Sequence, residues 1–249
     1  MSRRPLFDRP IAHRGLHDRA GGIIENSASA FAAAISAGYA IECDLQLSAD
    51  GVPIVFHDDT LERLTGRPGP VGDLTADELT RLPLLGSSTG DCPQRFTDFL
   101  AQIGGRTMLQ VELKRQTGPA TGMLAKKAAE AVANYTGPLT FESFDPALII
   151  MVKSFGFAGK RGIITYGYDK PDWDKGLSGA QRTFLRHLLH WPMSRFDFIS
   201  CHTEALDLPA IRFWRSLGTP VTAWTVRSPT IAQEVRDRVQ QIVFEGFSA

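Results

Sequence analysis

Cysteine is scarce in this chain of 249 residues. The three cysteines, Cys43, Cys92 and Cys201, are odd in number and lack the close spacing of metal ligands. The sequence therefore predicts neither a disulfide framework nor a cysteine-ligated zinc site. Cysteines of this kind fit reduced thiols in a cytoplasm, which is the compartment we expect.

An excess of one charge is also missing, because 27 Lys and Arg balance 27 Asp and Glu. No basic tail or Lys/Arg cluster occurs, which argues against nucleic acid as a partner. Asp8 and Arg9 interrupt the N-terminal segment where a signal core would lie. No apolar run approaches the ~20 residues of a transmembrane helix, so we expect no stable membrane insertion.

The glycine-rich turn of dinucleotide-binding folds does not follow the first predicted strand. The remaining composition, 43% hydrophobic and 22% charged residues, is that of an ordinary globular protein. Its length suits one large α/β domain or two small ones.

Strand and helix patterns alternate along the chain, which is typical of a parallel sheet with crossover helices. We expect strands near Ile11–His13, Ala40–Leu47, Thr107–Lys114, Leu139–Phe144, Gly162–Thr165, Phe196–His202, Pro220–Val226 and Gln241–Glu245. We expect helices between them near Ser27–Ala37, Thr97–Ile103, Pro119–Tyr135, Pro146–Phe155, Ala180–His190, Leu208–Leu217 and Pro229–Val239. Eight such steps in 249 residues match the size of a (β/α)₈ TIM barrel, which we predict as a single catalytic domain over residues 1–249. A doubly wound open sheet is the main alternative.

Residues 48–95 do not follow this alternation. They contain a tight turn at Asp50-Gly51, a short apolar strand ending at His57, and a proline-punctuated polar stretch with one helix near Thr75–Leu82. We interpret the segment as a small insertion between the second strand and the second helix, packed over one face of the barrel. At the other end, Phe247-Ser248-Ala249 is too short for an eighth helix, so a C-terminal helix is expected to be reduced or absent.

Carboxylates gather on two neighbouring predicted strands. Glu42 and Asp44 share one strand face, because successive side chains point to opposite faces, and Glu112 and Lys114 share a face of the next strand. A TIM barrel places its active site where strands end, so the three carboxylates would repel one another there without a cation. Oxygen donors without thiolates or clustered imidazoles favour Mg²⁺ or Ca²⁺ over Zn²⁺. A lone Glu-x-Asp is more often a solvated or salt-bridged pair, whereas the combined set indicates a metal site.

Two histidines stand at the ends of apolar strands: His13 ends the first strand and His57 ends the inserted hairpin. Imidazole titrates near neutral pH, so such a pair can supply a base and an acid in one turnover. Arg14 and Lys114 suit a phosphate anion. The other histidines lack such neighbours and are interpreted as structural: His17, His187, His190 and His202.

Short motifs run in one order along nearly the whole chain. They include His13-Arg14-Gly15, Glu25-Asn26-Ser27, Ile41-Glu42-Cys43-Asp44, Asp50-Gly51, His57-Asp58, Glu112-Leu113-Lys114, Ser143-Phe144-Asp145 and Trp224-Thr225-Val226. In this order they resemble the glycerophosphodiester phosphodiesterase family, and the N-terminal block is the most specific part.

The resemblance implies a TIM barrel with a small insertion after the second strand. It also implies metal-dependent hydrolysis of a glycerophosphodiester to glycerol 3-phosphate and an alcohol, with Mg²⁺ or Ca²⁺ as the cation, in lipid and glycerol metabolism. By position it implies Glu42, Asp44 and Glu112 as metal ligands, His13 and His57 as the acid–base pair, Arg14 and Lys114 as phosphate contacts, Glu25 near the metal, and Trp224 at the glycerol pocket.

The chain departs from the family pattern at four places. Ile24 stands where Pro is usual, Arg227 where Asn often follows Trp-Thr-Val, Glu142 where a neutral residue is usual, and Phe244-Glu245-Gly246-Phe247 replaces an aspartate-rich ending. The catalytic set is unchanged, so the preference for the leaving group is the property we expect to differ. Glu142 and Glu245 either favour a cationic head group such as choline or pair with a nearby Arg or Lys.

The sequence leaves the roles within the reaction open. The nucleophile is either water or the glycerol 2-hydroxyl of the substrate, and we favour His13 as the base and His57 as the acid. Strand 8 and the first helix lack a covering eighth helix. Residues 1–10 or a partner subunit could cover them, so we expect a monomer or a homodimer with a small-molecule substrate.

Three other functions are compatible with parts of the pattern. A lysophospholipase D-type phosphodiesterase on the same fold would favour an exposed apolar rim, for which the candidates are Phe7, Tyr166, Tyr168 and Trp173. A non-catalytic barrel that binds a phosphate metabolite would have lost a catalytic histidine or a metal carboxylate, and none is missing. A sugar hydrolase with paired carboxylates would not need His13-Arg14 or Lys114.

Overall fold

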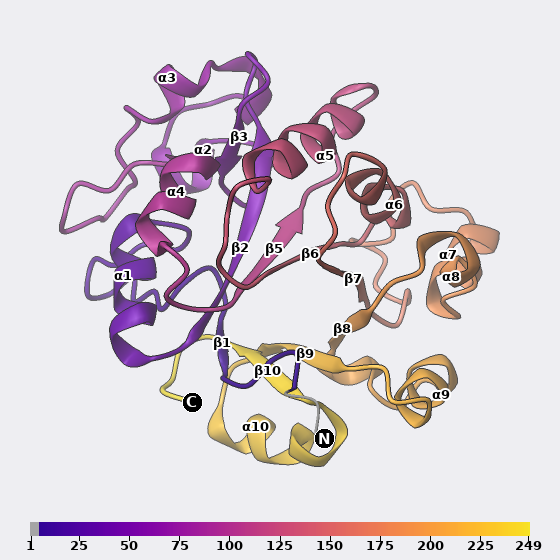
Figure 1. Ribbon diagram of the computed structural model, residues 1–249. Helices are drawn as coiled ribbons and strands as arrows, with labels where there is room; N and C mark the ends of the chain where they lie inside the picture. Colours follow the sequence, from indigo (N-terminus) through magenta and orange to yellow (C-terminus); the bar gives the residue numbers. More distant parts are fainter. Residues whose placement is uncertain (1–4) are drawn as a thin grey trace.

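A computed structural model describes residues 5–249, which form a closed barrel of parallel strands (Figure 1). In order around the barrel the strands are β1 (Ile11–Ala12), β2 (Ala40–Leu47), β5 (Leu109–Leu113), β6 (Leu139–Ser143), β7 (Lys160–Thr165), β8 (Phe198–His202), β9 (Val221–Val226) and β10 (Gln241–Phe244). The two-residue strand β1 pairs with both β10 and β2 and so closes the ring. The predicted (β/α)₈ barrel is therefore confirmed, and an open doubly wound sheet is excluded.

Helices follow the strands and surround the barrel. They are α1 (Ala28–Ala37), α4 (Phe96–Ile103), α5 (Ala120–Ala131), α6 (Pro146–Ser154), α7 (Gly179–Arg186), α8 (Trp191–Ser194), α9 (Pro209–Ser216) and α10 (Pro229–Val235), with 3₁₀ turns η2 (Thr203–Ala205) and η3 (Arg236–Arg238). The first of them shows why its ends lie where they do. Ser27 accepts a hydrogen bond from the Ala30 N–H, and Gly38 ends α1 with a left-handed φ of 78°.

The main apolar core lies between the strands and the surrounding helices. Cys43, Leu45 and Val111 point outward from the barrel and are fully buried there, together with Phe31 and Phe99 of α1 and α4. Because side chains alternate along a strand, the residues between them, such as Glu42 and Asp44, point into the barrel. The packing of the outer face thus sets the orientation of the polar residues on the inner face.

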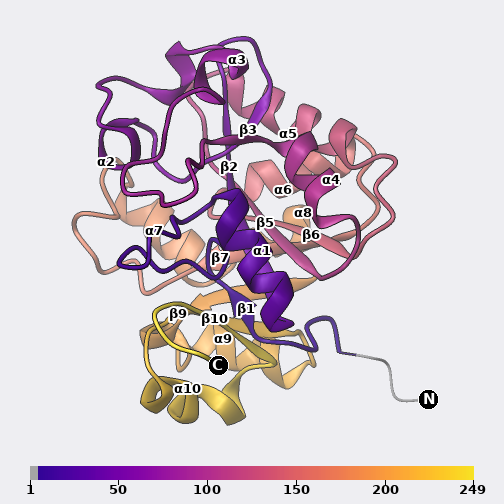
Figure 2. The same cartoon turned by 90° about the vertical axis from the view of Figure 1, so that its left-hand side faces the viewer.

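The segment from residue 48 to 95 gathers on one side of the barrel, next to β2 and away from α9 and α10 (Figure 2). It contains β3 (Pro53–Val55), α2 (Glu62–Thr65), η1 (Val71–Asp73), α3 (Ala76–Leu79) and β4 (Gln94–Arg95). β3 is antiparallel to both β2 and β4, and the segment has its own apolar cluster around Phe56 and Leu64. We predicted that residues 48–95 are an insertion subdomain within a single domain of residues 1–249, and this division into domains stays a prediction.

Two predicted helices are shorter than expected. The helix predicted near Thr75–Leu82 spans only Ala76–Leu79, because the residue before Pro83 disfavours helical backbone. The helix predicted near Ala180–His190 ends at Arg186, and Leu188 then has a left-handed φ of 53°. The sequence did not indicate α2, β4 or α8.

The two ends of the described chain lie where the barrel closes. Residues 245–249 form no helix, as predicted. Phe7 packs edge to face on Phe198 with ring centroids 5.0 Å apart, at the end of the barrel where the strands begin. The prediction that residues 1–10 or a partner subunit cover the eighth strand and the first helix is a separate point, and it falls partly on residues 1–4, which lie outside the described residues. Within residues 5–249, no helix is long and apolar enough to cross a bilayer.

Candidate active site

A cavity of about 1360 Å³ opens where the barrel strands end. Its lining includes His13, Arg14, Glu42, His57, Glu112, Lys114 and Trp224. Of the other predicted site residues, Asp44 lies against Lys114, and Glu25 contacts Arg14. The structure therefore brings all nine predicted site residues to one end of the barrel.

Glu42, Asp44 and Glu112 form one compact acidic cluster. Each offers a carboxylate oxygen, and these oxygens lie within 4.8 Å of one another. Asp44 and Glu112 are direct neighbours in the parallel register of β2 and β5. All three residues are buried, so the cluster owes its geometry to the barrel and not to solvent-exposed loops.

The ionisation of these carboxyl groups reflects their crowding. Burial and the neighbouring charges of Asp44 and Glu112 raise the pKa of Glu42 well above its ordinary value. Burial also raises the pKa of Glu112. The pKa of Asp44 is instead lowered, because Lys114, His57 and Arg14 outweigh the effect of its burial. Buried oxygen donors that repel one another fit a hard divalent cation such as Mg²⁺ or Ca²⁺.

Lys114 and Arg14 hold positive charge against this cluster. Lys114 Nζ lies 2.8 Å from Asp44 Oδ1 and 2.8 Å from Glu112 Oε1. Arg14 Nη1 donates to Glu25 Oε1 at 2.6 Å, and its backbone N–H donates to Glu42 Oε2 at 2.9 Å. Two fixed cations at the cavity wall can bind a phosphate anion.

The backbone conformation of the His13-Arg14-Gly15 motif explains why its third residue is glycine. Arg14 has a left-handed φ of 55°, and Gly15 follows with a φ of 80°. A Cβ on Gly15 would lie 2.9 Å from the Ala30 backbone, so glycine lets the turn pack directly on α1. This tight turn aims the Arg14 N–H at Glu42.

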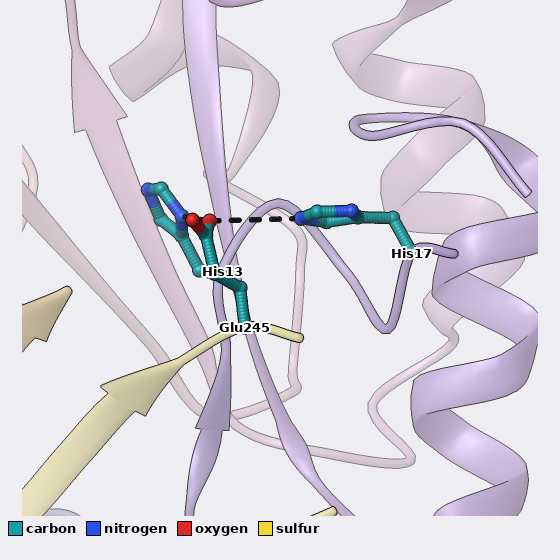
Figure 3. A group of neighbouring side chains, drawn as sticks. All are labelled: His13, His17 and Glu245. Atoms are coloured by element: carbon teal, nitrogen blue, oxygen red, sulfur yellow. Dashed lines mark hydrogen bonds and ion pairs between the residues drawn. The ribbon is translucent and has the colours of Figure 1, made fainter. Parts of the chain in front are cut away.

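Each of the two histidines donates its Nδ1–H to a carboxylate. His13 Nδ1 lies 2.5 Å from Glu245 Oε2 (Figure 3), and His57 Nδ1 lies 2.7 Å from Asp58 Oδ1. This assignment leaves Nε2 as the ring nitrogen available for proton transfer, and Nε2 of His13 lies 3.9 Å from Glu42. Burial lowers the pKa of His13, although its hydrogen bond to Glu245 acts in the opposite direction.

Two residues of the site, Asn26 and Arg63, were given no role by sequence reasoning. Asn26 Nδ2 donates to Asp44 Oδ2 at 2.8 Å and so orients that carboxylate. Arg63 Nη1 donates to Glu25 Oε2 at 2.7 Å, which holds the pKa of Glu25 down at about 2 against the effect of its burial. Asn26 lies within the Glu25-Asn26-Ser27 motif, which was the available signal, whereas the contact of Arg63 depends on the three-dimensional fold.

Aromatic rings form another wall of the cavity. Trp224 Nε1 donates to the Ser200 carbonyl at 3.0 Å, and its ring stacks on Trp173 with centroids 6.0 Å apart. Phe144 and His202 meet the Trp224 ring edge to face, at 5.5 and 5.0 Å. His202 therefore lines the cavity, although its structural interpretation stays a prediction.

The predicted apolar rim is only partly correct. Phe7 lies at the opposite end of the barrel, and Tyr166 and Tyr168 are buried in a mutual stack at 4.1 Å, so none of the three forms a rim. Trp173 is 50% exposed and is the one candidate that does. Aromatic residues in a loop can bury themselves against one another, which the sequence does not show.

Glu245 and Glu142, which depart from the family pattern, have different hydrogen-bond partners. Glu245 Oε1 accepts from Arg227 Nε at 2.7 Å, so the expected pairing with a nearby Arg is found. No Lys or Arg among residues 5–249 forms an ion pair with Glu142, which instead accepts from Gln110 Nε2 at 2.8 Å. Burial raises the pKa of Glu142 to about 8, so this carboxyl group is mostly neutral at pH 7.

Sequence comparison finds similarity to one family of known proteins. The profile described as "Glycerophosphoryl diester phosphodiesterase family" matches residues 13–246. Glycerophosphodiester phosphodiesterase 1 of Bos taurus is 26% identical over 241 residues, which is 88% of this chain and 71% of that protein. Glycerophosphodiester phosphodiesterase of Caldanaerobacter subterraneus subsp. tengcongensis is 41% identical over 73 residues, which is 29% of each chain.

Solved structures share the fold. A phosphodiesterase from Oleispira antarctica, in complex with the product sn-glycerol-3-phosphate, superposes with a TM-score of 0.78 at 22% identity, covering 96% of this chain and 93% of that one. A putative glycerophosphoryl diester phosphodiesterase from Silicibacter pomeroyi gives a TM-score of 0.77 at 21% identity, covering 97% and 90%. At these identities the likeness supports the barrel fold.

Proposed function

Because the chain belongs to the glycerophosphoryl diester phosphodiesterase family, we propose that it hydrolyses glycerophosphodiesters to glycerol 3-phosphate and an alcohol with a divalent cation, Mg²⁺ or Ca²⁺. The observation that carries this proposal is one cavity that holds an acidic cluster, two fixed cations and two histidines. The relatives named glycerophosphodiester phosphodiesterases support the substrate class.

The binding step follows from the charges. A phosphodiester anion repels nucleophiles, so its oxygens must be neutralised before attack. We assign this to Arg14 and Lys114, which present N–H donors at the cavity wall. Glu42, Asp44 and Glu112 would hold the cation, which when bound supplies further positive charge to the phosphoryl group. Trp224 would face the glycerol moiety.

The proton transfers use the two imidazoles. With Nδ1–H donated to Glu245, His13 has a lone pair on Nε2 and accepts the proton of the nucleophile, which is water or the glycerol 2-hydroxyl. His57 in its protonated form donates from Nε2 to the leaving oxygen. The hydrogen bonds to His57 and Arg63 hold the pKa of Asp58 well below its ordinary value despite burial, so a negative charge faces the His57 imidazolium.

Chelation provides the direct test of metal dependence. We expect exhaustive EDTA treatment to abolish the release of glycerol 3-phosphate from glycerophosphocholine, and Mg²⁺ or Ca²⁺ to restore it, because the acidic cluster would lose its neutralising charge. Release is measured with several head groups, and circular dichroism after chelation checks that the barrel stays folded. Full activity of the chelated protein would reject the metal-dependent mechanism.

A second candidate function is favoured by the apolar part of the cavity. Its volume of about 1360 Å³ exceeds the roughly 300–1,000 Å³ of common small-molecule sites. Exposed apolar side chains continue its lining away from the phosphate contacts: Ile150, Trp173, Phe184 and Met193. Such a surface suits the acyl chain of a lysophospholipid, so we propose lysophospholipase D-type cleavage as the alternative activity.

Substitution of this apolar surface separates the two substrate classes. In the double variant Phe184→Ser/Met193→Ser we expect kcat/KM for a lysophospholipid to fall about tenfold. Such a fall corresponds to the loss of about 1.4 kcal/mol of apolar contact with the acyl chain. The same constant for glycerophosphocholine is expected to change less than about threefold, because this substrate has no acyl chain. Equal losses for both substrates, or no cleavage of the lysophospholipid by the unaltered chain, would contradict the alternative.

A further inference from the structure

Both histidines of the site are held by the same arrangement, in which an arginine binds a carboxylate and the carboxylate binds the imidazole. Arg227 Nε lies 2.7 Å from Glu245 Oε1, and Glu245 Oε2 lies 2.5 Å from His13 Nδ1. On the other side of the site, Arg63 Nε lies 2.6 Å from Asp58 Oδ2, and Asp58 Oδ1 lies 2.7 Å from His57 Nδ1.

We propose that Glu245 is a positioning residue for His13, and that Arg227 holds Glu245 in place; this inference rests on the proposed function. Glu245 accepts the Nδ1–H of His13 and so selects the tautomer with its lone pair on Nε2, the nitrogen that must take the proton. Arg227 binds the other carboxylate oxygen and keeps Glu245 from rotating away.

The barrel backbone places the three residues together. His13 follows β1, Glu245 follows β10 and Arg227 follows β9, and these are adjacent strands. The His13 N–H donates to the Phe244 carbonyl at 2.9 Å, and the Glu245 N–H donates to the Val226 carbonyl at 3.1 Å. Backbone hydrogen bonds between adjacent strands therefore hold the side chains of His13, Glu245 and Arg227 in contact.

The same contacts argue against two other roles for Glu245. Recognition of a cationic head group would need a free carboxylate oxygen, yet Arg227 and His13 occupy one oxygen each. A metal ion is the other option, since donor atoms of His13, His17 and Glu245 lie within 4.8 Å of one another (Figure 3). However, His13 Nδ1 and Glu245 Oε2 are 2.5 Å apart, which is a hydrogen-bond contact too close for two ligands of one ion, and Arg227 already neutralises the carboxylate.

Kinetics of Glu245 variants test the positioning role. We expect Glu245→Ala to lower kcat for glycerophosphocholine about 10- to 100-fold, the range for lost partners of a functional histidine, with KM changed less than about threefold. Glu245→Gln should keep more activity than Glu245→Ala, because the amide oxygen still accepts the Nδ1–H. Glu130→Ala removes an exposed glutamate of α5 far from the cavity and serves as the matched control.

Nitrogen NMR of the His13 ring gives a readout that does not depend on turnover. We expect His13 to be the Nδ1–H tautomer in the unaltered chain and in Glu245→Gln. In Glu245→Ala we expect a mixture of the Nδ1–H and Nε2–H tautomers. The melting temperature of each variant checks that it is folded. If the unaltered chain releases no glycerol 3-phosphate but shows this pattern, the proposed function fails and the positioning of His13 stands.

Two results would overturn the inference. One is a Glu245→Ala variant with unchanged kcat and an unchanged tautomer. The other is inhibition by added Zn²⁺ that disappears in His17→Ala, combined with unchanged kcat in Glu245→Ala, which would identify the three residues as a metal site. If Glu245→Ala does not fold, Glu245→Val, which also lacks an acceptor, takes its place in both measurements and is judged by the same two results.

Discussion

His13→Ala and His57→Ala are each expected to abolish measurable release of glycerol 3-phosphate, since one positioned acid or base contributes about 10²–10⁴-fold to the rate. The fold should survive both changes, because both side chains line the open cavity, where solvent can fill the space that they leave. The carboxylates left behind keep their arginine partners, Arg227 for Glu245 and Arg63 for Asp58. Loss of activity would thus report on chemistry.

The two histidines can be told apart with an activated substrate. A diester with p-nitrophenol as the leaving group needs no acid, so it should restore turnover in His57→Ala far more than in His13→Ala. His187→Ala is the control, since His187 is exposed on the turn after α7 and does not line the cavity. Substantial residual activity on glycerophosphocholine in either variant would contradict the acid–base assignment.

Glu112→Gln is expected to remove metal binding and turnover together. The change keeps the size of the side chain but replaces a carboxylate of the acidic cluster by a neutral amide. Several kcal/mol of transition-state stabilisation by a metal correspond to a loss in kcat of more than about 100-fold. Calorimetric titration with Mg²⁺ and Ca²⁺ measures the affinity, and the product assay measures kcat.

Glu142→Gln is the matched control for this variant. Glu142 stands beside Glu112 in the register of β6 and β5 and is equally enclosed in the barrel. Its pKa of about 8 keeps it mostly neutral at pH 7, so an amide there changes the charge little. Cation affinity should therefore stay within about threefold of the unaltered chain. Equal loss of affinity in both variants would indicate that a different set of residues binds the cation.

Much of the barrel could be predicted from the sequence because its signals are local. Apolar segments alternate with amphipathic helices, and the period-two pattern of Glu42 and Asp44 places both on one strand face. Helix ends were less predictable where the tertiary structure decides them, as at Leu188, whose left-handed backbone ends α7 early. The burial of Tyr166 and Tyr168 likewise depends on packing.

The partners of the site residues were beyond sequence reasoning because they are distant in the chain. His13 and Glu245 are 232 positions apart, and Arg63 and Glu25 are 38 apart. Closure of the barrel brings the first pair together, and packing of the segment of residues 48–95 brings Arg63 of α2 to Glu25. The sequence showed that Glu245 and Arg227 were unusual but could not show that they contact each other.

The two-residue strand β1 makes the surroundings of His13 depend on closure of the barrel. His13 and Arg14 follow this strand, which pairs with β10, and Glu245 after β10 supplies the carboxylate partner of His13. A chain without β10 would keep Glu42, Asp44 and Glu112 but lack the carboxylate that holds His13. Under the proposed assignment such a chain has no oriented base, so we expect it not to cleave phosphodiesters.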